Sequence, residues 1–230
     1  MVKKTKILYA EDDKTLAFLT ADNLALHHYD VDHYADGIAC LEAFRANTYA
    51  ICIFDVMLPG IDGFELATAV RKMNQHIPII FLSAKTLKED RIKGLRLGAD
   101  DYLVKPFSIE ELVLKIEVFI NRSQKNNNVP TQLYVVSKYQ FDPANFILKN
   151  ESEQVNLTQR EAELLKFFLD NKNKVVKREQ LLNSIWGQDD YFMGRSLDVF
   201  VSRLRKIFSS DEKVKIENLH GIGFKFVEKD

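Results

Sequence analysis

Ile51-Cys52-Ile53-Phe54-Asp55 is the stretch that decides the fold, because four apolar residues lead directly into an acid. A short, wholly apolar run is typical of a strand that is buried on both faces, as in a parallel sheet. Three further apolar runs also end at a polar side chain: Ile7–Ala10 before Glu11, Ile79–Leu82 before Ser83, and Tyr102–Val104 before Lys105. A weaker strand is predicted at Tyr29–His33.

Segments with helical spacing separate these strands. They are Thr15–Leu26, Phe64–Met73, Glu89–Leu97 and Glu110–Ile120. Strands that alternate with helices form βα units, in which helices cover both faces of a parallel sheet. Five strands that alternate with helices in about 120 residues predict an α/β doubly wound sheet of the flavodoxin-like order.

A polar, asparagine-rich segment divides the chain and ends near Pro130. We therefore predict a first domain over residues 1–122, a linker over 123–131 and a second domain over 132–230. The second domain begins with short strands, continues with helices at about 158–171, 177–186 and 195–208, and closes with a hairpin around Gly221-Ile222-Gly223. This order predicts an α+β winged helix-turn-helix domain.

Composition is that of an ordinary globular protein, with 46% hydrophobic and 28% charged residues among 230. No segment approaches the roughly 18 consecutive apolar residues of a membrane span, and the N-terminal segment does not resemble a signal peptide. We therefore expect a cytoplasmic protein without a membrane partner. Cys40 and Cys52 are too few for a disulfide framework or a zinc site, and we expect Cys52 to be a reduced, buried thiol.

The polar residues at the strand ends predict one site, because ligands bind outside the carboxyl ends of the strands in such a sheet. Glu11, Asp12 and Asp55 would repel one another without a cation, and an all-oxygen site suits Mg²⁺. A carboxylate beside that cation can attack phosphorus, while Lys105 neutralises charge and Ser83 donates a hydrogen bond. Taken singly, Asp55 could be a turn residue and Glu11-Asp12 an acidic helix cap.

Four motifs taken together resemble the receiver domain of bacterial response regulators. They are Glu11-Asp12-Asp13, Asp55-Val-Met-Leu-Pro-Gly-Ile-Asp-Gly63, Ser83-Ala84 and Gly98-Ala-Asp-Asp-Tyr-Leu-Val-Lys-Pro-Phe107, within residues 5–122. The resemblance implies that a sensor histidine kinase phosphorylates Asp55. It implies that Asp12 and Asp55 ligate Mg²⁺ directly, that Glu11 acts through water, and that Met57 offers its backbone carbonyl. It also implies a cis peptide before Pro106 and a switch formed by Ser83 and Tyr102.

The same resemblance implies a homodimer that forms on phosphorylation through the fourth helix, fifth strand and fifth helix. The charged residues expected on that face are Lys93, Arg96, Asp100, Asp101, Glu111, Lys115 and Glu117. Opposite charges on facing elements can pair across a two-fold interface, and we expect Arg96 and Glu117 to do so. The alternative is an ordinary solvated face, since exposed ion pairs contribute little.

Leu197, Val201, Leu204 and Phe208 form an apolar stripe at helical spacing, which leaves basic residues for solvent. An exposed basic helix suits the major groove of DNA, and a wing can reach phosphates. With Thr158-Gln-Arg-Glu161 and His220-Gly-Ile-Gly-Phe-Lys-Phe226, the pattern resembles the OmpR/PhoB winged-helix effector over residues ~132–228. The expected DNA contacts are Arg195, Ser196, Phe200, Ser202, Arg203, Arg205, Lys206, His220 and Lys225.

The resemblance implies a phosphorylation-activated transcription regulator whose partner is double-stranded promoter DNA. Trp186 would be a core residue, and the loop from Gln188 to Met193 is a candidate contact for RNA polymerase. Such a receiver is not an enzyme in the ordinary sense, because it catalyses only its own phosphorylation and dephosphorylation. Two other functions stay open on the residues alone: a phosphotransferase or phosphatase that uses an aspartyl-phosphate, and a protein-interaction module that binds no DNA.

Overall fold

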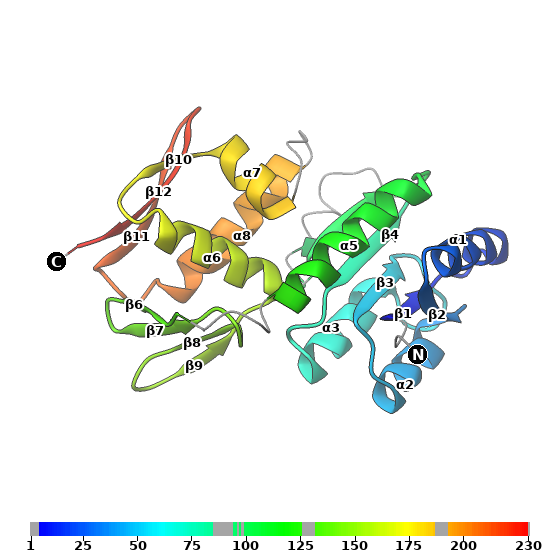
Figure 1. Ribbon diagram of the computed structural model, residues 1–230. Coiled ribbons are helices and arrows are strands. Elements are labelled where there is room, and N and C mark those ends of the chain that lie inside the picture. The colour runs from blue at the N-terminus through cyan, green and yellow to red at the C-terminus, as the bar shows by residue number, and fades with distance from the viewer. Residues whose placement is uncertain are drawn as a thin grey trace. The chain divides into compact units, whose positions relative to one another are not determined.

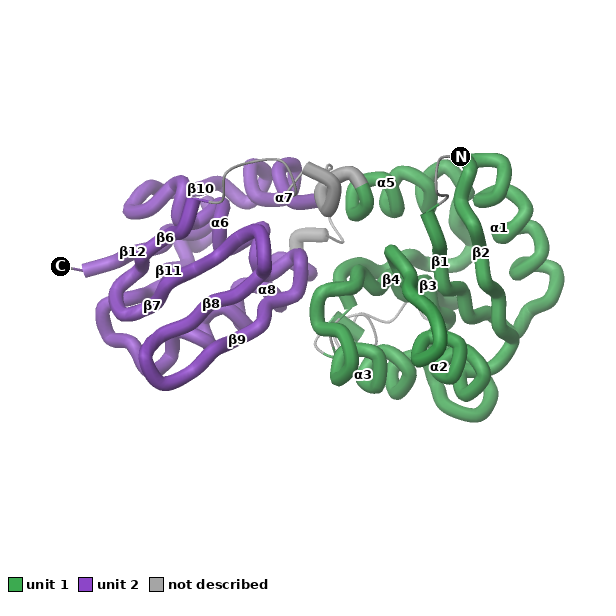
Figure 2. The backbone as a smooth tube through the Cα atoms, turned by 60° about the horizontal axis from the view of Figure 1, so that its bottom comes forward, with its two compact units in different colours: residues 1–125 green, residues 126–230 purple. Residues whose placement is uncertain are grey.

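A computed structural model of the chain describes residues 5–84, 94–95, 97, 99–125, 132–186 and 193–229. The chain divides into two compact units, residues 1–125 and 126–230, which Figure 2 distinguishes by colour. The last helix of the first unit runs to Lys125, so three residues that we expected in the linker continue this helix.

The first unit is a five-stranded sheet with the strand order β2-β1-β3-β4-β5, and its neighbouring strands pair in parallel (Figure 1). This confirms the predicted doubly wound fold. Its described elements are β1 (Thr5–Ala10), α1 (Lys14–Leu26), β2 (Tyr29–Tyr34), α2 (Gly37–Ala46), β3 (Ile51–Asp55), α3 (Gly63–Met73), β4 (Ile79–Ser83), β5 (Asp101–Val104) and α5 (Ile109–Lys125). The predicted helix Glu89–Leu97 lies mostly outside the described residues, and α2 was not among the segments assigned from periodicity.

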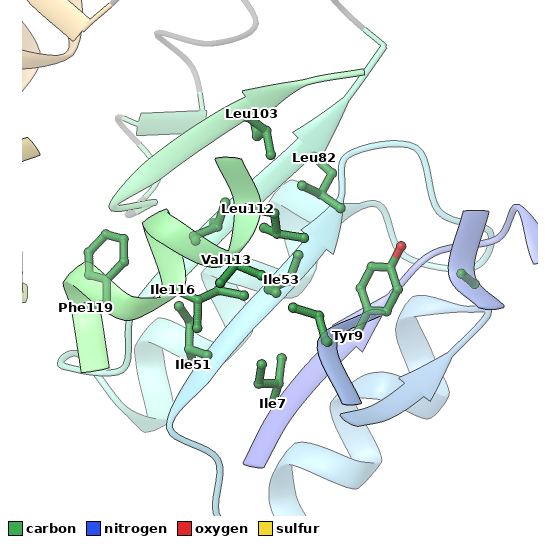
Figure 3. Packing of buried hydrophobic residues seen from close by; sticks show 13 residues of the cluster. Ile7, Tyr9, Ile51, Ile53, Leu82, Leu103, Leu112, Val113, Ile116 and Phe119 are labelled. Atoms are coloured by element: carbon green, nitrogen blue, oxygen red, sulfur yellow. The ribbon is translucent and has the colours of Figure 1, made fainter. Parts of the chain in front are cut away.

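One hydrophobic core lies between the sheet and the pair α1 and α5. Ile7, Ile53 and Leu82 contribute to it from the sheet, and Leu112 and Ile116 contribute from α5 (Figure 3). Alternate residues of the same strands point to the other face, where the rings of α3 and β4 pack edge to face. Both faces of the sheet are therefore covered, which explains why its strands are continuous apolar runs.

Side-chain caps fix the helices that follow the strand ends. Asp13 accepts hydrogen bonds from the backbone N–H groups of Thr15 and Leu16, at 2.9 and 3.0 Å, so α1 begins directly after the acidic pair. Asp62 and Glu65 form a reciprocal capping box at the start of α3. These caps hold the loops that carry the polar strand-end residues.

The described residues of the second unit form two antiparallel sheets and three helices, which confirms the predicted α+β winged-helix domain. Its elements are β6 (Tyr134–Val136), β7 (Tyr139–Asp142), β8 (Ile147–Lys149), β9 (Gln154–Asn156), α6 (Gln159–Asp170), β10 (Val175–Lys177), α7 (Arg178–Trp186), α8 (Met193–Ile207), β11 (Val214–Leu219) and β12 (Gly223–Glu228). Strands β6 to β9 form a meander, and β10 joins the closing hairpin in the order β10-β12-β11. Strand β10 was not predicted.

Aromatic side chains fill the core of the second unit. The rings of Phe168 and Phe226 stack at 6.1 Å, and Phe208 meets both Phe226 and Tyr139 edge to face. Trp186 is buried as predicted, against Phe200. Among the described residues of either unit, none of the helices is both long and apolar enough to cross a membrane.

Candidate phosphoryl-acceptor site and DNA-binding surface

The three predicted acids converge at the carboxyl ends of β1 and β3. Glu11, Asp12 and Asp55 each offer a carboxylate oxygen, and these oxygens lie within 4.8 Å of one another. Glu11 is fully buried and Asp55 nearly so, whereas Asp12 is exposed. The cluster therefore opens to solvent on the side of Asp12.

Lys105 brings a positive charge to this cluster from the end of β5. Its Nζ lies 2.7 and 2.5 Å from the two oxygens of Glu11 and 2.6 Å from Oδ2 of Asp55. Burial would lower the pKa of Lys105, but the hydrogen bonds to Asp55 and Glu11 outweigh it and raise this pKa. The Lys105 ammonium is thus stabilised in its charged form and donates a hydrogen bond directly to Asp55, the predicted phosphoacceptor.

The cluster retains an excess of negative charge. Three carboxylates and one ammonium leave two net negative charges when all are ionised. Burial and the nearby charge of Asp55 together raise the pKa of Glu11 to about 7, against the opposing effect of Lys105. Oxygen donors with two excess negative charges fit a divalent metal cation.

Backbone contacts hold Asp55 in place. The backbone N–H of Met57 donates to Asp55 Oδ1 at 2.9 Å. Gly63, the first residue of α3, packs so closely that an added Cβ would lie 2.1 Å from the backbone oxygen of Asp55. The glycine at the end of the receiver-like motif is therefore required by close approach of two backbones. The Met57 backbone carbonyl stays a predicted metal ligand.

Two further residues contact Glu11 that the sequence did not single out. The Tyr9 hydroxyl lies 3.5 Å from Glu11 Oε2, and the ring of His33 donates from Nε2 to the Glu11 backbone oxygen at 2.8 Å. The Tyr9 and His33 rings are 5.5 Å apart. Tyr9 could have been found from its place two residues before Glu11, whereas His33 depends on the pairing of β1 with β2.

The predicted switch residues both lie inside the first unit. Ser83 ends β4 and is fully buried, and the Tyr102 ring is buried edge-on to Phe81 at 6.4 Å. The Tyr102 side chain is thus buried in this structure, and its part in a switch stays a prediction. The Lys105–Pro106 peptide is cis, as the resemblance implied.

Three residues that we expected at a dimer interface are engaged inside the unit instead. Asp100 is fully buried, and its Oδ2 accepts from Arg71 Nη2 at 2.5 Å and from the Ile79 backbone at 2.9 Å. Asp101 pairs with Lys115 at 3.0 Å, and both side chains are at least 95% buried. Asp100, Asp101 and Lys115 are therefore structural residues here, because a buried charge needs a partner nearby.

The remaining expected interface residues divide into two groups. Lys93 and Arg96 lie outside the described residues, Glu111 is partly buried and Glu117 is exposed. Burial raises the pKa of Tyr29, and the negative charge of Glu117 raises it further. The pairing of Glu117 with Arg96 stays a prediction, because Arg96 lies outside the described residues.

In the second unit, helix α8 presents one exposed stripe. Its exposed residues are Asp198, Ser202, Arg205 and Lys206, at spacings of three to four residues or adjacent. Arg195 lies one turn earlier in the same helix, and its side chain is outside the described set. Arg205 Nε and Nη2 donate to the Ile216 backbone oxygen, at 2.9 and 2.7 Å, and so tie the stripe to β11.

Two residues that we expected to contact DNA are buried, which contradicts this expectation. Phe200 is fully buried with its ring centroid 5.7 Å from that of Trp186, and Ser196 is also buried. Phe200 follows Leu197 by three residues and precedes Leu204 by four, so it belongs to the apolar face of α8. Arg203, a third expected DNA contact, is partly engaged within the unit, because its Nη1 donates to Glu161 Oε1 at 2.9 Å.

The closing hairpin supplies the other expected contacts. His220 is exposed and Lys225 partly exposed, on either side of the turn where Gly221 has a φ of 74°. Arg178 was missed by the sequence analysis: it starts α7 and binds Asp198 of the exposed stripe. The segment 187–192 lies outside the described residues, so most of the expected polymerase contact does too.

The parallel sheet with clustered acids and a lysine at its carboxyl edge, followed by a winged helix, defines the class of two-component regulators with a DNA-binding domain. Residues 7–117 match the family described as "Response regulator receiver domain", and residues 152–226 match "Transcriptional regulatory protein, C terminal". The chain belongs to the OmpR/PhoB family of response regulators. It is a transcription regulator and not a conventional enzyme.

Similar proteins span the whole chain. The transcriptional regulatory protein RprY of Bacteroides fragilis is 43% identical over 99% of this chain and 96% of its own length. The response regulator ArlR of Staphylococcus saprophyticus is 36% identical over 96% of this chain and 98% of its own. Among solved structures, DrrB, an OmpR/PhoB homologue of Thermotoga maritima, is 27% identical with a TM-score of 0.52, covering 98% of this chain and all of that one. A receiver implies a histidine kinase partner, and the C-terminal domain implies DNA binding.

Proposed function

We propose that Asp55 accepts a phosphoryl group from a phosphohistidine of a sensor kinase, and that this event controls binding of the second unit to promoter DNA. The observation that carries the proposal is the position of Asp55. It is almost buried, 2.6 Å from the Lys105 ammonium, and part of a cluster of acids that needs a cation.

In the transfer, the phosphorus–nitrogen bond of the donor breaks and a phosphorus–oxygen bond to Asp55 forms. Met57 holds Oδ1 of Asp55 through its N–H, and Lys105 holds Oδ2, so the carboxylate is oriented before the donor arrives. Lys105 then balances negative charge on the transferred group. A divalent cation held by Asp12, Asp55 and, through water, Glu11, with the Met57 carbonyl, would supply further positive charge there.

A phosphorylated Asp55 adds about −1.5 to −2 charge units and three strong acceptor oxygens at the end of β3. Ser83, at the end of the neighbouring strand β4, is the hydroxyl that reaches them, and Tyr102 is the side chain whose packing responds. We propose that the altered surface favours a homodimer, with Glu111 among the described residues and Lys93 and Arg96 outside them as interface residues.

The dimer would then bind promoter DNA in the cytoplasm and contact RNA polymerase through the segment 188–193. The DNA face that we propose comprises Ser202, Arg205 and Lys206 of α8, Arg195 one turn earlier, and His220 and Lys225 of the hairpin. Arg203 can reach DNA only by giving up its ion pair with Glu161.

Intact-mass spectrometry with a small phosphoryl donor tests the acceptor. The full chain is incubated with acetyl phosphate and Mg²⁺ and compared with Asp55→Ala and with Asp30→Asn, which removes an exposed acid of β2 away from the cluster. We expect one phosphoryl adduct on the wild type and on Asp30→Asn, and none on Asp55→Ala. An adduct that persists in Asp55→Ala would refute the assignment.

Size-exclusion chromatography with light scattering on the same samples tests the consequence. We expect monomers without the donor and dimers with it, and the shift should require Asp55. Duplex DNA should be retarded by the phosphorylated wild type at a lower protein concentration than by Asp55→Ala. Equal retardation would leave a DNA-binding protein that phosphorylation does not control.

A further inference from the structure

Arg178 and Asp198 form an ion pair on the exposed face of α8. Arg178 Nη1 and Nη2 donate to Oδ1 and Oδ2 of Asp198, both at 2.9 Å, so the pair is bidentate. The side chains are 33% and 55% exposed, which places the pair at the surface rather than in the core. Such a fork fixes the orientation of a guanidinium as well as its position.

Arg178 also joins three elements at one point. It is the first residue of α7, and its backbone N–H donates to the oxygen of Ile222, in the wing turn, at 3.2 Å. Its guanidinium carbon lies 5.2 Å from the centre of the Phe224 ring in β12. Asp198 of α8, Phe224 of the hairpin and the start of α7 therefore together position the guanidinium of Arg178.

The presence of Asp198 on this face needs an explanation. A carboxylate on a helix that faces DNA is repelled by the phosphates. This repulsion lowers DNA affinity unless the carboxylate also makes an interaction that favours binding. It could accept from a cytosine amino group in the major groove. Both of its oxygens are instead engaged by Arg178, which favours a role in holding that residue.

We propose that Arg178 contacts a phosphate of the bound DNA and that Asp198 is its positioning residue. This inference rests on the proposed binding of duplex DNA by the second unit. A guanidinium has five N–H donors in a planar fork, so it can serve a carboxylate and a phosphate at once. Asp198 strengthens DNA binding through Arg178 although its own charge opposes it.

A double-mutant cycle tests this arrangement in the full chain. The probe is a fluorescein-labelled, mixed-sequence duplex of about 30 base pairs, titrated in KCl from about 50 to 200 mM. For Arg178→Ala we expect the slope of log affinity against log salt to become shallower by about 0.9. At about 0.1 M salt this corresponds to roughly eightfold weaker binding, because 0.1 to the power −0.9 is about 8.

Whether Asp198→Ala weakens or strengthens DNA binding decides whether Asp198 positions Arg178. With Arg178 present, Asp198→Ala should weaken binding, although it removes a negative charge. In the Arg178→Ala background it should leave binding unchanged or strengthen it. Asp198→Asn, which keeps an acceptor oxygen, should weaken binding less than Asp198→Ala. Thermal unfolding of every variant verifies that the second unit is folded during the titrations.

Two matched controls come from the β8–β9 hairpin, where Lys149→Ala and Glu151→Ala remove exposed charges away from the pair. They should alter affinity less than their counterparts at Arg178 and Asp198. Stronger binding by Asp198→Ala in the wild-type background, or additive effects in the cycle, would overturn the inference while DNA binding stands. A wild-type chain that binds no duplex under any salt condition would overturn the proposed DNA binding, and the inference with it.

Discussion

Phe200 can be either a core residue or a DNA contact, and its truncation to alanine distinguishes these two roles. The side chain is fully buried, its ring centroid is 5.7 Å from that of Trp186, and the Arg203 guanidinium carbon lies 5.4 Å from the centre of its ring. If it is a core residue, Phe200→Ala removes a ring that the surroundings cannot fully replace. If it contacts DNA, the same change lowers affinity and leaves stability alone.

The expected loss of stability is large. Truncation of a buried phenylalanine to alanine costs about 3–5 kcal/mol, because the transfer free energy and the cavity both count. With a urea m-value of about 2 kcal/mol/M for a small unit, a loss of about 4 kcal/mol moves the unfolding midpoint down by about 2 M. Phe200→Leu should cost less than about 1.5 kcal/mol, since most of the volume is kept.

Fluorescence during urea unfolding reads this out well, because Trp186 is the single tryptophan of the chain and contacts Phe200. Ser202→Ala is the control: it is exposed on the same helix, and surface changes usually stay within about 0.5 kcal/mol. An unchanged midpoint in Phe200→Ala, combined with weaker DNA binding under conditions where the unit is folded, would refute our assignment of Phe200 to the core.

Three further predictions follow from the first unit. Lys115→Ala should lower the free energy of unfolding by about 3–5 kcal/mol in the unphosphorylated monomer, because it strands buried Asp101; an effect on dimerisation alone would contradict this. Gly63→Ala should prevent both stable folding and phosphorylation, measured by urea unfolding and intact mass, because its Cβ would collide with the end of β3; a stable, phosphorylatable variant would be unexpected. Burial would raise the pKa of Asp32, but the hydrogen bonds from Lys6 and Tyr49, with the charge of Lys6, outweigh it and lower this pKa. The stabilisation is therefore present above the unfolded pKa and is lost as pH falls through the lower folded value. Unfolding free energies measured below pH ~4 should therefore fall more steeply for the wild type than for Asp32→Asn, and parallel curves would contradict this.

Strand ends made the acceptor site predictable from the sequence. An apolar run that stops at an acid marks the edge of a parallel sheet, and Glu11, Asp55 and Lys105 each follow such a run. Because all parallel strands end on the same edge, sequence order alone brings these side chains together. The structure adds what order cannot supply, namely that Lys105 binds both acids directly.

Other features depended on contacts that no local pattern records. Strand β10 has three residues and exists because it pairs with β12, almost fifty positions later. Asp100 and Asp101 look like exposed charges in sequence, yet each is buried beside a basic residue from a different helix. Phe200 is a different case: its spacing from Leu197 and Leu204 is that of the apolar face of α8, whereas the resemblance to DNA-binding relatives assigns it to the DNA-reading face. Its burial agrees with the spacing.

The burial of Phe200 and Ser196 bears on how phosphorylation could govern DNA binding. It leaves the exposed stripe of α8 with few groups that can reach base edges, since Asp198 holds Arg178 and Arg205 is tied to the Ile216 backbone. With the proposed DNA face, most of the affinity of one winged helix would then come from phosphate contacts, which carry little sequence information. Two linked copies bind adjacent half-sites with a high effective concentration and read twice as many base pairs. If the receiver dimerises on phosphorylation as proposed, bringing two chains together would therefore suffice to switch on specific binding.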